Sequence, residues 1–271
     1  MFTPKDEDLE RGWPGRIEGD RVIQLAAQTL QSFFTGGGQA REHAEYALAD
    51  VRFRPPVLQP PSLRDFYAFE GHVRRVRELR GAGPVPVEWY EIPVFYFSNP
   101  AAIYGPDDEI PYPRGTQELD YELEVAAVIG AEGQIGGFTV MNDWSARDLQ
   151  QAEMRVGLGP SKGKDFATSL GPVVVTPDEV DGSSGEMVAR VNGEERSRGN
   201  LADMHHSWEA MVTHAAQNTR LLPGDVLGSG TVGTGCILEA GDDRWLVPGD
   251  VVELEVEGIG VLRNTVGPRR G

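Results

Sequence analysis

Three carboxylates stand at alternate positions in the stretch LDYELEVAAVIG, residues 119 to 130. The stretch alternates as a strand does, so Asp120, Glu122 and Glu124 share a face with Ala126 and Val128. A strand with one solvated face would explain the acids, yet this face turns apolar after Glu124. We therefore expect both faces to be covered. Glu122 and Glu124 would then lie in a partly buried pocket, where a cation or protons compensate their charge.

A third acid, Asp143, precedes a predicted helix in TVMNDWSARDLQQAEM. Ser145 and Asp148 form a capping-box pattern, which predicts a helix from about Ala146 and leaves Asp143 in the loop before it. Loops that leave a strand at the edge of a core often carry functional side chains. A surface ion pair between Asp143 and Arg147, four residues on, explains the same pattern and is the preferred interpretation of this segment taken alone.

The segment GLGPSKGKDFATSLGP is a glycine-rich loop with two cations, Lys162 and Lys164. Its spacing departs from that of a phosphate-binding P-loop at Leu158 and Asp165, so the segment does not predict a nucleotide site. Such a loop can still bring a cation to an anionic ligand, and the alternative is a flexible solvated loop.

A histidine stands in RDFYAFEGHV, together with Asp65 and Tyr67. On its own, His72 is expected to be a surface or hydrogen-bonded core residue, because most helical histidines are. The segment ADMHHSWEAMVTH lacks the HExxH zinc pattern, so its polar side chains are interpreted as surface or packing residues. These side chains are His205, His206, Glu209 and His214. Cys236 has no nucleophile-elbow motif beside it and is expected to be a small buried hydrophobe.

The elements that position these residues are mostly strands. We expect a small N-terminal lobe or arm over residues 1–62, with a strand-to-helix stretch in DRVIQLAAQTL and a helix in QAREHAEYALADV, and a second domain over 63–271. In the second domain we expect one helix over roughly 65–80, another over about 203–219, and a hairpin turn at Asn192-Gly193. The remaining β-branched segments predict an α+β, mainly β fold in which the sheet folds on itself as a sandwich or roll.

Composition narrows the class of protein. The chain has 271 residues, 39% of them hydrophobic, and a formal net charge of −17. That charge argues against nucleic acid or an anionic membrane as a partner, because both bind basic surfaces. No stretch approaches the roughly 20 apolar residues of a membrane span, and the first residues are acidic and polar, unlike a signal peptide. We therefore expect a cytoplasmic protein. The single cysteine, Cys236, excludes an internal disulfide and is compatible with a reducing compartment.

These segments, taken in order over residues 62–266, resemble the fumarylacetoacetate hydrolase family. The motifs that carry the resemblance are DFY followed by His72, then DYELEVAAVIG, NDWSARDLQ, GKDFATSLGP, LLPGDVLGSGT and GCILE. The resemblance implies a mixed β-sandwich roll of the fumarylacetoacetase C-terminal type and a homodimer.

The resemblance also implies one divalent cation bound by Asp65, Glu122, Glu124 and Asp143. Four hard oxygen ligands favour magnesium first, with calcium or manganese as alternatives, over zinc. The charge of such a cluster requires compensation, which the cation supplies together with nearby basic side chains.

The remaining site residues follow from the same resemblance. His72, oriented by Glu239, would be the general base. Lys164, Arg147 and Gln150 would hold the developing oxyanion and a carboxylate of the substrate. The residues expected to shape the pocket are Tyr67, Tyr96, Thr168 and Thr231.

The implied reaction is hydrolysis of a carbon–carbon bond in a small anionic β-diketone acid, such as a fumarylacetoacetate or an acylpyruvate, in aromatic-compound or tyrosine catabolism. Two alternatives stay open. One is a decarboxylase or isomerase of a 2-keto dicarboxylic acid on the same metal site. The other is a non-catalytic binding protein that the metal only stabilises. The pair of His72 with Glu239 favours hydrolysis, because isomerisation or decarboxylation of a metal-bound keto acid needs no activated water.

Overall fold

Two β-sheets form the body of the structure, a computed structural model that describes residues 1–7 and 9–269. The larger sheet has the strand order β7-β6-β17-β11-β12-β14-β8. Its strands are β6 (Leu63–Phe66), β7 (Phe95–Phe97), β8 (Ile103–Tyr104), β11 (Leu123–Ile129), β12 (Ile135–Asp143), β14 (Thr168–Val175) and β17 (Val226–Gly228). Strands β6 and β17 are parallel, as are β8 and β14, and the other neighbours are antiparallel.

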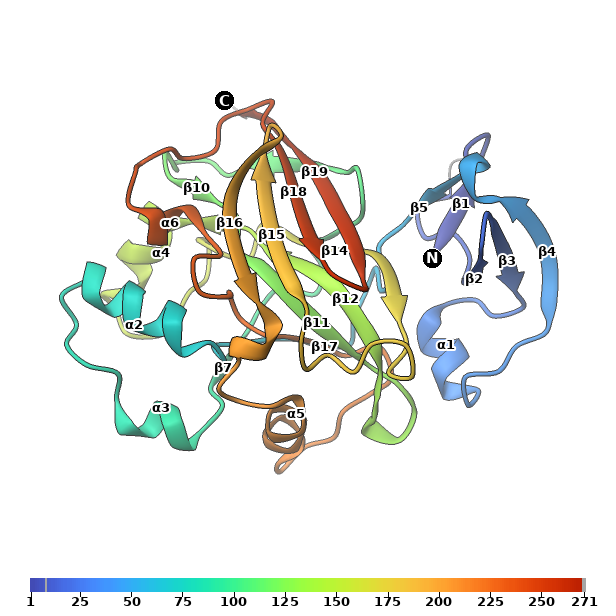
Figure 1. Ribbon diagram of the computed structural model, residues 1–271, viewed down its shortest axis with the longest axis horizontal. Helices are drawn as coiled ribbons and strands as arrows, with labels where there is room; N and C mark the ends of the chain where they lie inside the picture. The colour runs from blue at the N-terminus through green and yellow to red at the C-terminus, as the bar shows by residue number, and fades with distance from the viewer. Residues whose placement is uncertain (8, 270–271) are drawn as a thin grey trace.

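The second sheet has the order β16-β15-β18-β19-β9 and packs against the first (Figure 1). Its strands are β9 (Glu109–Tyr112), β15 (Glu186–Val191), β16 (Glu194–Asn200), β18 (Val251–Val256) and β19 (Gly260–Arg269). A short ribbon pairs β10 (Leu119–Asp120) with β13 (Ser145–Ala146). The hairpin turn at Asn192-Gly193 joins β15 to β16, with both residues at positive φ, as predicted. The α+β, mainly β prediction with mixed, curled sheets is confirmed.

Strand β11 is covered on both faces, which answers the question that its alternating sequence raises. Val125 and Ala127 belong to the core between the two sheets, whereas Ala126 and Val128 belong to a second core on the other face. The apolar half of the acidic face is therefore buried because a further layer covers it.

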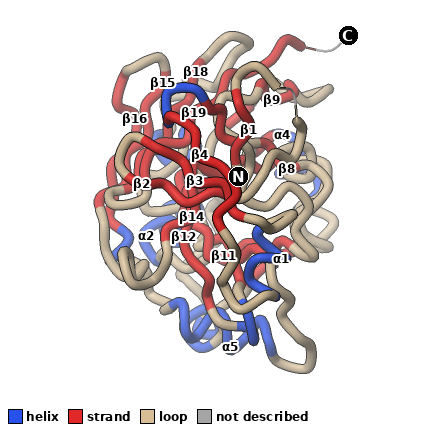
Figure 2. The backbone as a smooth tube through the Cα atoms, turned by 90° about the vertical axis from the view of Figure 1, so that its right-hand side faces the viewer, coloured by secondary structure: helices blue, strands red, loops and turns tan. Residues whose placement is uncertain are grey.

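That layer comes from the N-terminal residues, which form two small sheets and a helix at the right of Figure 1. The elements are β1 (Phe2–Pro4), β2 (Gly15–Glu18), β3 (Arg21–Leu25), α1 (Leu30–Thr35), β4 (Glu42–Ala47), a 3-10 turn (Leu48–Asp50) and β5 (Val51–Phe53). Phe34 of α1 joins the second core with Ala126 and Val128. Figure 2, seen from the lobe, shows β2, β3 and β4 in front of the main sheets.

Five further helices complete the described chain. They are α2 (Glu70–Leu79), α3 (Val87–Glu91), α4 (Arg147–Met154), α5 (Trp208–Ala216) and α6 (Ile237–Ala240), with 3-10 turns at Ala131–Gly133 and Leu201–Asp203. In Figure 1, α2, α3, α4 and α6 lie on the side of the sheets opposite the lobe. Within the residues described, no helix is both long and apolar enough to cross a membrane.

Three local predictions were wrong. Residues 42–47 form strand β4 where a helix was expected. Asp65 lies in strand β6, because the predicted helix over 65–80 begins only at Glu70. Helix α4 does begin after Ala146, but without the capping box, since the Ser145 hydroxyl donates to the Asp143 carbonyl oxygen instead.

Candidate active site

Strands β6, β11 and β12 of the larger sheet, with β17 between β6 and β11, bring four acidic side chains to one place. Asp65 comes from β6, Glu124 from β11 and Asp143 from the end of β12, while Glu122 directly precedes β11. One carboxylate oxygen each from Asp65, Glu122 and Asp143 lies within 4.8 Å of the others. All four side chains are buried, which is unusual for carboxylates unless they are paired or bind a cation.

The chemistry of this cluster suits a hard divalent cation. Oδ1 of Asp65 and Oδ1 of Asp143 are buried and accept no hydrogen bond within the described chain. Gly228 of β17 faces the cluster: a Cβ atom there would lie 2.5 Å from Asp65 Oδ1 and 3.0 Å from Glu124 Oε2. Oxygen ligands with free lone pairs, around a space that a methyl group would fill, fit Mg²⁺, Ca²⁺ or Mn²⁺.

Two buried cations pair with the cluster. Lys164 Nζ lies 2.5 Å from Glu122 Oε2 and 2.6 Å from Asp143 Oδ2. Arg147 Nη2 lies 2.8 Å from Glu122 Oε1, in an ion pair. Asp143 therefore pairs with Lys164, not with Arg147 as the surface interpretation of its segment supposed. The glycine-rich loop likewise carries a buried lysine, whereas its other lysine, Lys162, is 73% exposed.

The cluster divides into acids that favour a proton and one that favours its charge. Burial, and then the neighbouring Asp143 charge, raises the pKa of Asp65 well above its ordinary value. Burial and the Asp65 charge do the same for the pKa of Glu124. Burial also acts on Glu122, but Lys164 and Arg147 outweigh it and lower the pKa of that carboxyl. Without a cation, the structure therefore favours protons on Asp65 and Glu124.

A histidine and a glutamate meet at the other side of the site. His72 of α2 and Glu239 of α6 are both buried, with Nδ1 2.5 Å from Glu239 Oε1. Glu239 Oε2 accepts the backbone N–H of Thr234 at 2.9 Å, which fixes the carboxylate. The Nδ1 contact leaves Nε2 as the ring nitrogen for proton transfer. The Tyr67 ring packs edge-on against His72, and burial raises the pKa of its hydroxyl to about 12.

Three of the acids, Asp65, Glu122 and Glu124, line one cavity of about 300 Å³ together with His72. Of the other predicted site residues, those on its wall are Tyr67, Tyr96, Arg147, Gln150, Lys164 and Thr231. Asp143, Thr168 and Glu239 are not on the wall. Thr168 lies beside Asp143 on the neighbouring strand, and Asp143 lies behind Lys164 and Tyr96, whose hydroxyl donates to Asp143 Oδ2 at 2.5 Å.

Sequence reasoning missed two charged residues of the site. Asp120 is fully buried and accepts from Arg147 Nε at 2.8 Å and from the backbone N–H of Ile237 at 2.8 Å. It thus joins Arg147 to helix α6, which carries Glu239. Its place two residues before Glu122, on the same face of the stretch, was the available signal.

Arg80 is the second missed residue. It lines the cavity, and its guanidinium makes no hydrogen bond or ion pair with a described residue. His72, Val76 and Arg80 stand four residues apart, and all three line the cavity. This helical spacing was a signal for one face of α2 turned to the site.

The other candidate residues lie elsewhere or play structural parts. His206 is buried and its Nε2 lies 2.7 Å from the Trp89 carbonyl oxygen, as expected of a packing residue. Cys236 is buried, with Sγ 3.8 Å from Glu239 Oε1, as expected of a small hydrophobe.

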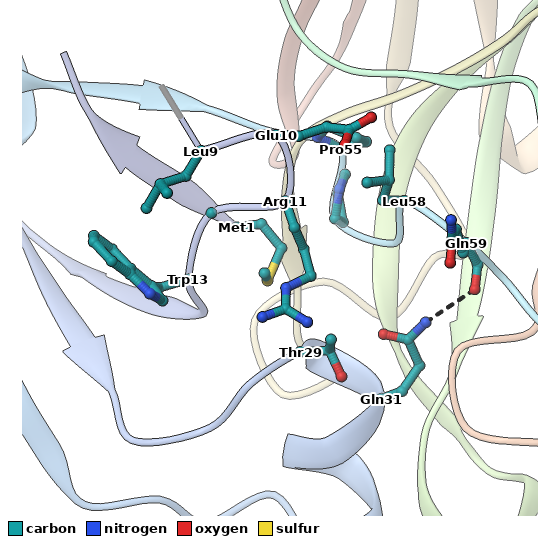
Figure 3. A pocket seen from close by; sticks show the side chains of 12 residues that line it. Met1, Leu9, Glu10, Arg11, Trp13, Thr29, Gln31, Pro55, Leu58 and Gln59 are labelled. Atoms are coloured by element: carbon teal, nitrogen blue, oxygen red, sulfur yellow. Dashed lines mark hydrogen bonds between the residues drawn. The ribbon is translucent and has the colours of Figure 1, made fainter. Parts of the chain in front are cut away.

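A larger cavity, of about 660 Å³, lies in the N-terminal lobe, between Trp13, Thr29 and Pro55 (Figure 3). Its described lining has one carboxylate, Glu10, and no histidine or cysteine. A single carboxylate is too few for a cation site, so the acidic cavity is the candidate active site.

Comparison with known proteins identifies the family. The family described as "Fumarylacetoacetate (FAA) hydrolase C-terminal" matches residues 62–267. Mitochondrial oxaloacetate tautomerase FAHD2A of Homo sapiens is 37% identical over 277 residues, which cover 92% of this chain and 84% of that protein.

Solved structures agree. Fumarylacetoacetate hydrolase from Exiguobacterium antarcticum has 28% identity and a TM-score of 0.77, with coverage of 94% of this chain and 95% of that one. The 5-carboxymethyl-2-hydroxymuconate delta-isomerase from Mycobacterium smegmatis has 29% identity and a TM-score of 0.74, with coverage of 95% and 94%. The relatives thus include a hydrolase, an isomerase and a tautomerase. With its family match and its acidic cavity in the matched region, the chain belongs to the fumarylacetoacetate hydrolase family.

Proposed function

We propose that this protein is a divalent-cation-dependent enzyme that interconverts the keto and enol forms of a small 2-oxo dicarboxylic acid of the oxaloacetate type. The observation that carries the proposal is the meeting, in one cavity, of a hard-cation site with the His72–Glu239 pair. A cation site and a base together suit proton transfer next to a carbonyl group. The likeness to oxaloacetate tautomerases over 92% of the chain supports the substrate class.

A cation bound by Asp65, Glu122, Glu124 and Asp143 would supply a Lewis acid that makes the hydrogens beside a 2-keto group acidic. His72 Nε2 takes a proton from C3 of the keto form, and the charged ring then gives a proton to the oxygen at C2, so the enol has the same composition and the base is regenerated. Glu239 keeps the ring in the tautomer that accepts at Nε2, and it stabilises the charged ring afterwards. Lys164 and Arg147 supply positive charge while the oxygen at C2 is negative.

Two features of the cavity support a dicarboxylic acid. Arg80 is a cation on the wall without an acidic partner among the described residues, and a guanidinium binds carboxylates in two-pronged fashion. The acids, Lys164 and Arg147 lie deeper and are buried. A substrate with a keto acid at one end and a second carboxylate at the other would therefore match charge at both ends.

Hydrolysis of a carbon–carbon bond in an acylpyruvate or fumarylacetoacetate is the second candidate. The observation that favours it is the same His72–Glu239 pair, which can equally take a proton from water. We place it second because proton transfer at C3 also needs a base. The sequence interpretation used the pair to favour hydrolysis, but the presence of a base does not by itself distinguish hydrolysis from proton transfer at C3. Decarboxylation, and a metal-stabilised protein without activity, remain outcomes of the test.

Magnesium as the cation, a homodimer and a cytoplasmic location remain predictions for this chain. So do the assigned roles of the individual site residues and the division of the chain at residue 62. Metal analysis of the purified protein and its mass in solution measure the first two directly.

The test measures enol absorbance and pyruvate release when purified protein is mixed with oxaloacetate that is enriched in one tautomer. One sample contains magnesium and the other contains excess chelator. Loss of enol absorbance that needs metal and yields no pyruvate supports the tautomerase. Release of pyruvate and carbon dioxide selects the decarboxylase, and cleavage of acylpyruvates without action on oxaloacetate selects the hydrolase. If the folded, metal-loaded protein turns over neither oxaloacetate nor an acylpyruvate, the result supports the non-catalytic binding protein.

A further inference from the structure

The loop between α4 and Lys164 is held to the protein in an uneven way. Its outer half projects into solvent, with the side chains of Val156 and Leu158 83% and 95% exposed. Gly157 and Gly159, both at positive φ, lie in the same stretch. Apolar packing therefore does not fix this part of the loop, although the loop ends at the buried Lys164.

The inner half is tied to one side chain on helix α4. The Glu153 carboxylate accepts three backbone N–H groups: Oε2 from Ser161 at 2.8 Å and Gly163 at 3.2 Å, and Oε1 from Lys162 at 2.6 Å. Burial works against the charged carboxylate, but these three donors outweigh it and hold the pKa of Glu153 below its ordinary value. The carboxylate is therefore ionised at neutral pH and makes strong, charge-assisted hydrogen bonds.

Gly163 brings the same turn into contact with the helix. A Cβ atom on Gly163 would lie 2.6 Å from the Gln150 backbone nitrogen, so only glycine fits this approach. The Gly163 carbonyl oxygen also accepts the Ala146 N–H at 2.8 Å. The next residue, Lys164, is thereby presented to Glu122 and Asp143.

We infer that Glu153 is a positioning residue for the reaction: it folds the 161–163 turn onto α4 and so holds the Lys164 ammonium between Glu122 and Asp143. The chemical consequence rests on the proposed function, in which Lys164 stabilises the negative oxygen. The geometric consequence does not, because the ion pairs of Lys164 exist whatever the substrate is.

The experiment uses the fact that Lys5, Lys162 and Lys164 are the only lysines in the chain. Lys5 and Lys162 are exposed, whereas Lys164 is buried. In magnesium-loaded protein labelled with ¹⁵N-lysine, NMR should show one ammonium group that exchanges slowly with water, and Lys164→Arg should remove its signal. We expect Glu153→Ala to shift or broaden this signal, and Glu153→Gln, which keeps one oxygen acceptor, to have a smaller effect. Gln151→Ala, an exposed change on the same helix, should leave it unchanged.

Turnover of oxaloacetate is measured on the same samples. We expect Glu153→Ala to lower kcat by about tenfold to a hundredfold with little change in KM, because misplacing a catalytic group by about 1 Å has effects of this size. A Lys164 signal and a kcat in Glu153→Ala equal to those of the wild type would overturn the inference. If the wild type has no activity on oxaloacetate, the proposed function fails, and the Lys164 signal alone still decides whether Glu153 positions the lysine.

Discussion

At the scale of single residues, the site is governed by buried charge. The four predicted ligand acids face Lys164 and Arg147, but Asp120 also pairs with Arg147. Five carboxylates and two cations leave three negative charges, which a divalent ion reduces to one. The metal-free cluster must therefore hold protons, in agreement with the raised pKa values of Asp65 and Glu124.

Metal binding should consequently release protons. A raised carboxyl pKa in the folded state stabilises the fold below the ordinary value, and this stabilisation is lost as the pH rises through the raised value. The lowered pKa of Glu122 has the opposite sign, but this one group opposes three, since burial raises the pKa of Asp143 as well. We therefore expect the increase in Tm caused by Mg²⁺ to grow as the pH rises from weakly acidic to neutral. Thermal unfolding with and without Mg²⁺ measures it, and a pH-independent increase would contradict the charge argument.

The base is expected to be separable from the metal site. His72→Ala should lower turnover by about 10²–10⁴-fold, the usual contribution of a general base. The Kd for Mg²⁺ should change little, because His72 contacts Glu239 and not the acidic cluster. Steady-state kinetics measures the turnover rate, and calorimetric titration measures the Kd for Mg²⁺. Equal loss of turnover and metal binding would assign His72 to the metal site instead.

At the scale of elements, strand β17 forms part of the proposed cation site without contributing a ligand. Gly228 pairs with Asp65 on β6 and with Ala126 on β11. The carboxylates of Asp65 and Glu124 lie close to its Cα, where a side chain would collide with them. A glycine inside a strand often marks a close approach of this kind.

Gly228→Ala should therefore displace Asp65 or Glu124 and weaken Mg²⁺ binding by about 10–100-fold, as changes to the groups that orient metal ligands do. Gly71→Ala is the matched control, because a Cβ there meets its nearest atom, Gly233 Cα, at an ordinary 3.8 Å. Calorimetric Mg²⁺ titration of both variants makes the comparison. An unchanged Kd for Gly228→Ala would show that the carboxylates tolerate the methyl group.

The elements also mark where sequence reasoning succeeds and fails. The alternation of residues 119–130 predicted the buried strand, because a period of two identifies both faces. The pattern of residues 39–51 misled, since Ala44, Ala47 and Leu48 fit a helical period, whereas the strand in fact half-buries Ala44 and Tyr46. Arg80 was missed because its role depends on which face of α2 meets the sheet, and that is set by tertiary packing.

At the scale of the whole molecule, the N-terminal lobe supplies the layer that covers the outer face of the central sheet. The Phe34 ring packs where Gly136 leaves room, since a Cβ on Gly136 would lie 2.7 Å from the ring. The apolar half of the acidic strand is thus buried by residues about ninety positions earlier, a contact that no local pattern reveals.

Phe34→Ala should therefore lower the free energy of unfolding by about 3–5 kcal/mol, the usual loss for a buried phenylalanine. Ile17→Ala, a change at a 41% exposed residue of the same lobe, should cost less than about 1 kcal/mol. Urea denaturation compares the two. Equal small losses would mean that the lobe contributes little to the second core.

The central claim is that a cation and the His72–Glu239 pair act together on a 2-oxo dicarboxylic acid. The most direct measurement is the rate of enol loss from oxaloacetate with the wild type in Mg²⁺, the wild type in chelator, and His72→Ala in Mg²⁺. The account predicts fast loss in the first sample alone, without release of pyruvate. Equal rates in all three samples, with Mg²⁺ shown to be bound, would contradict it.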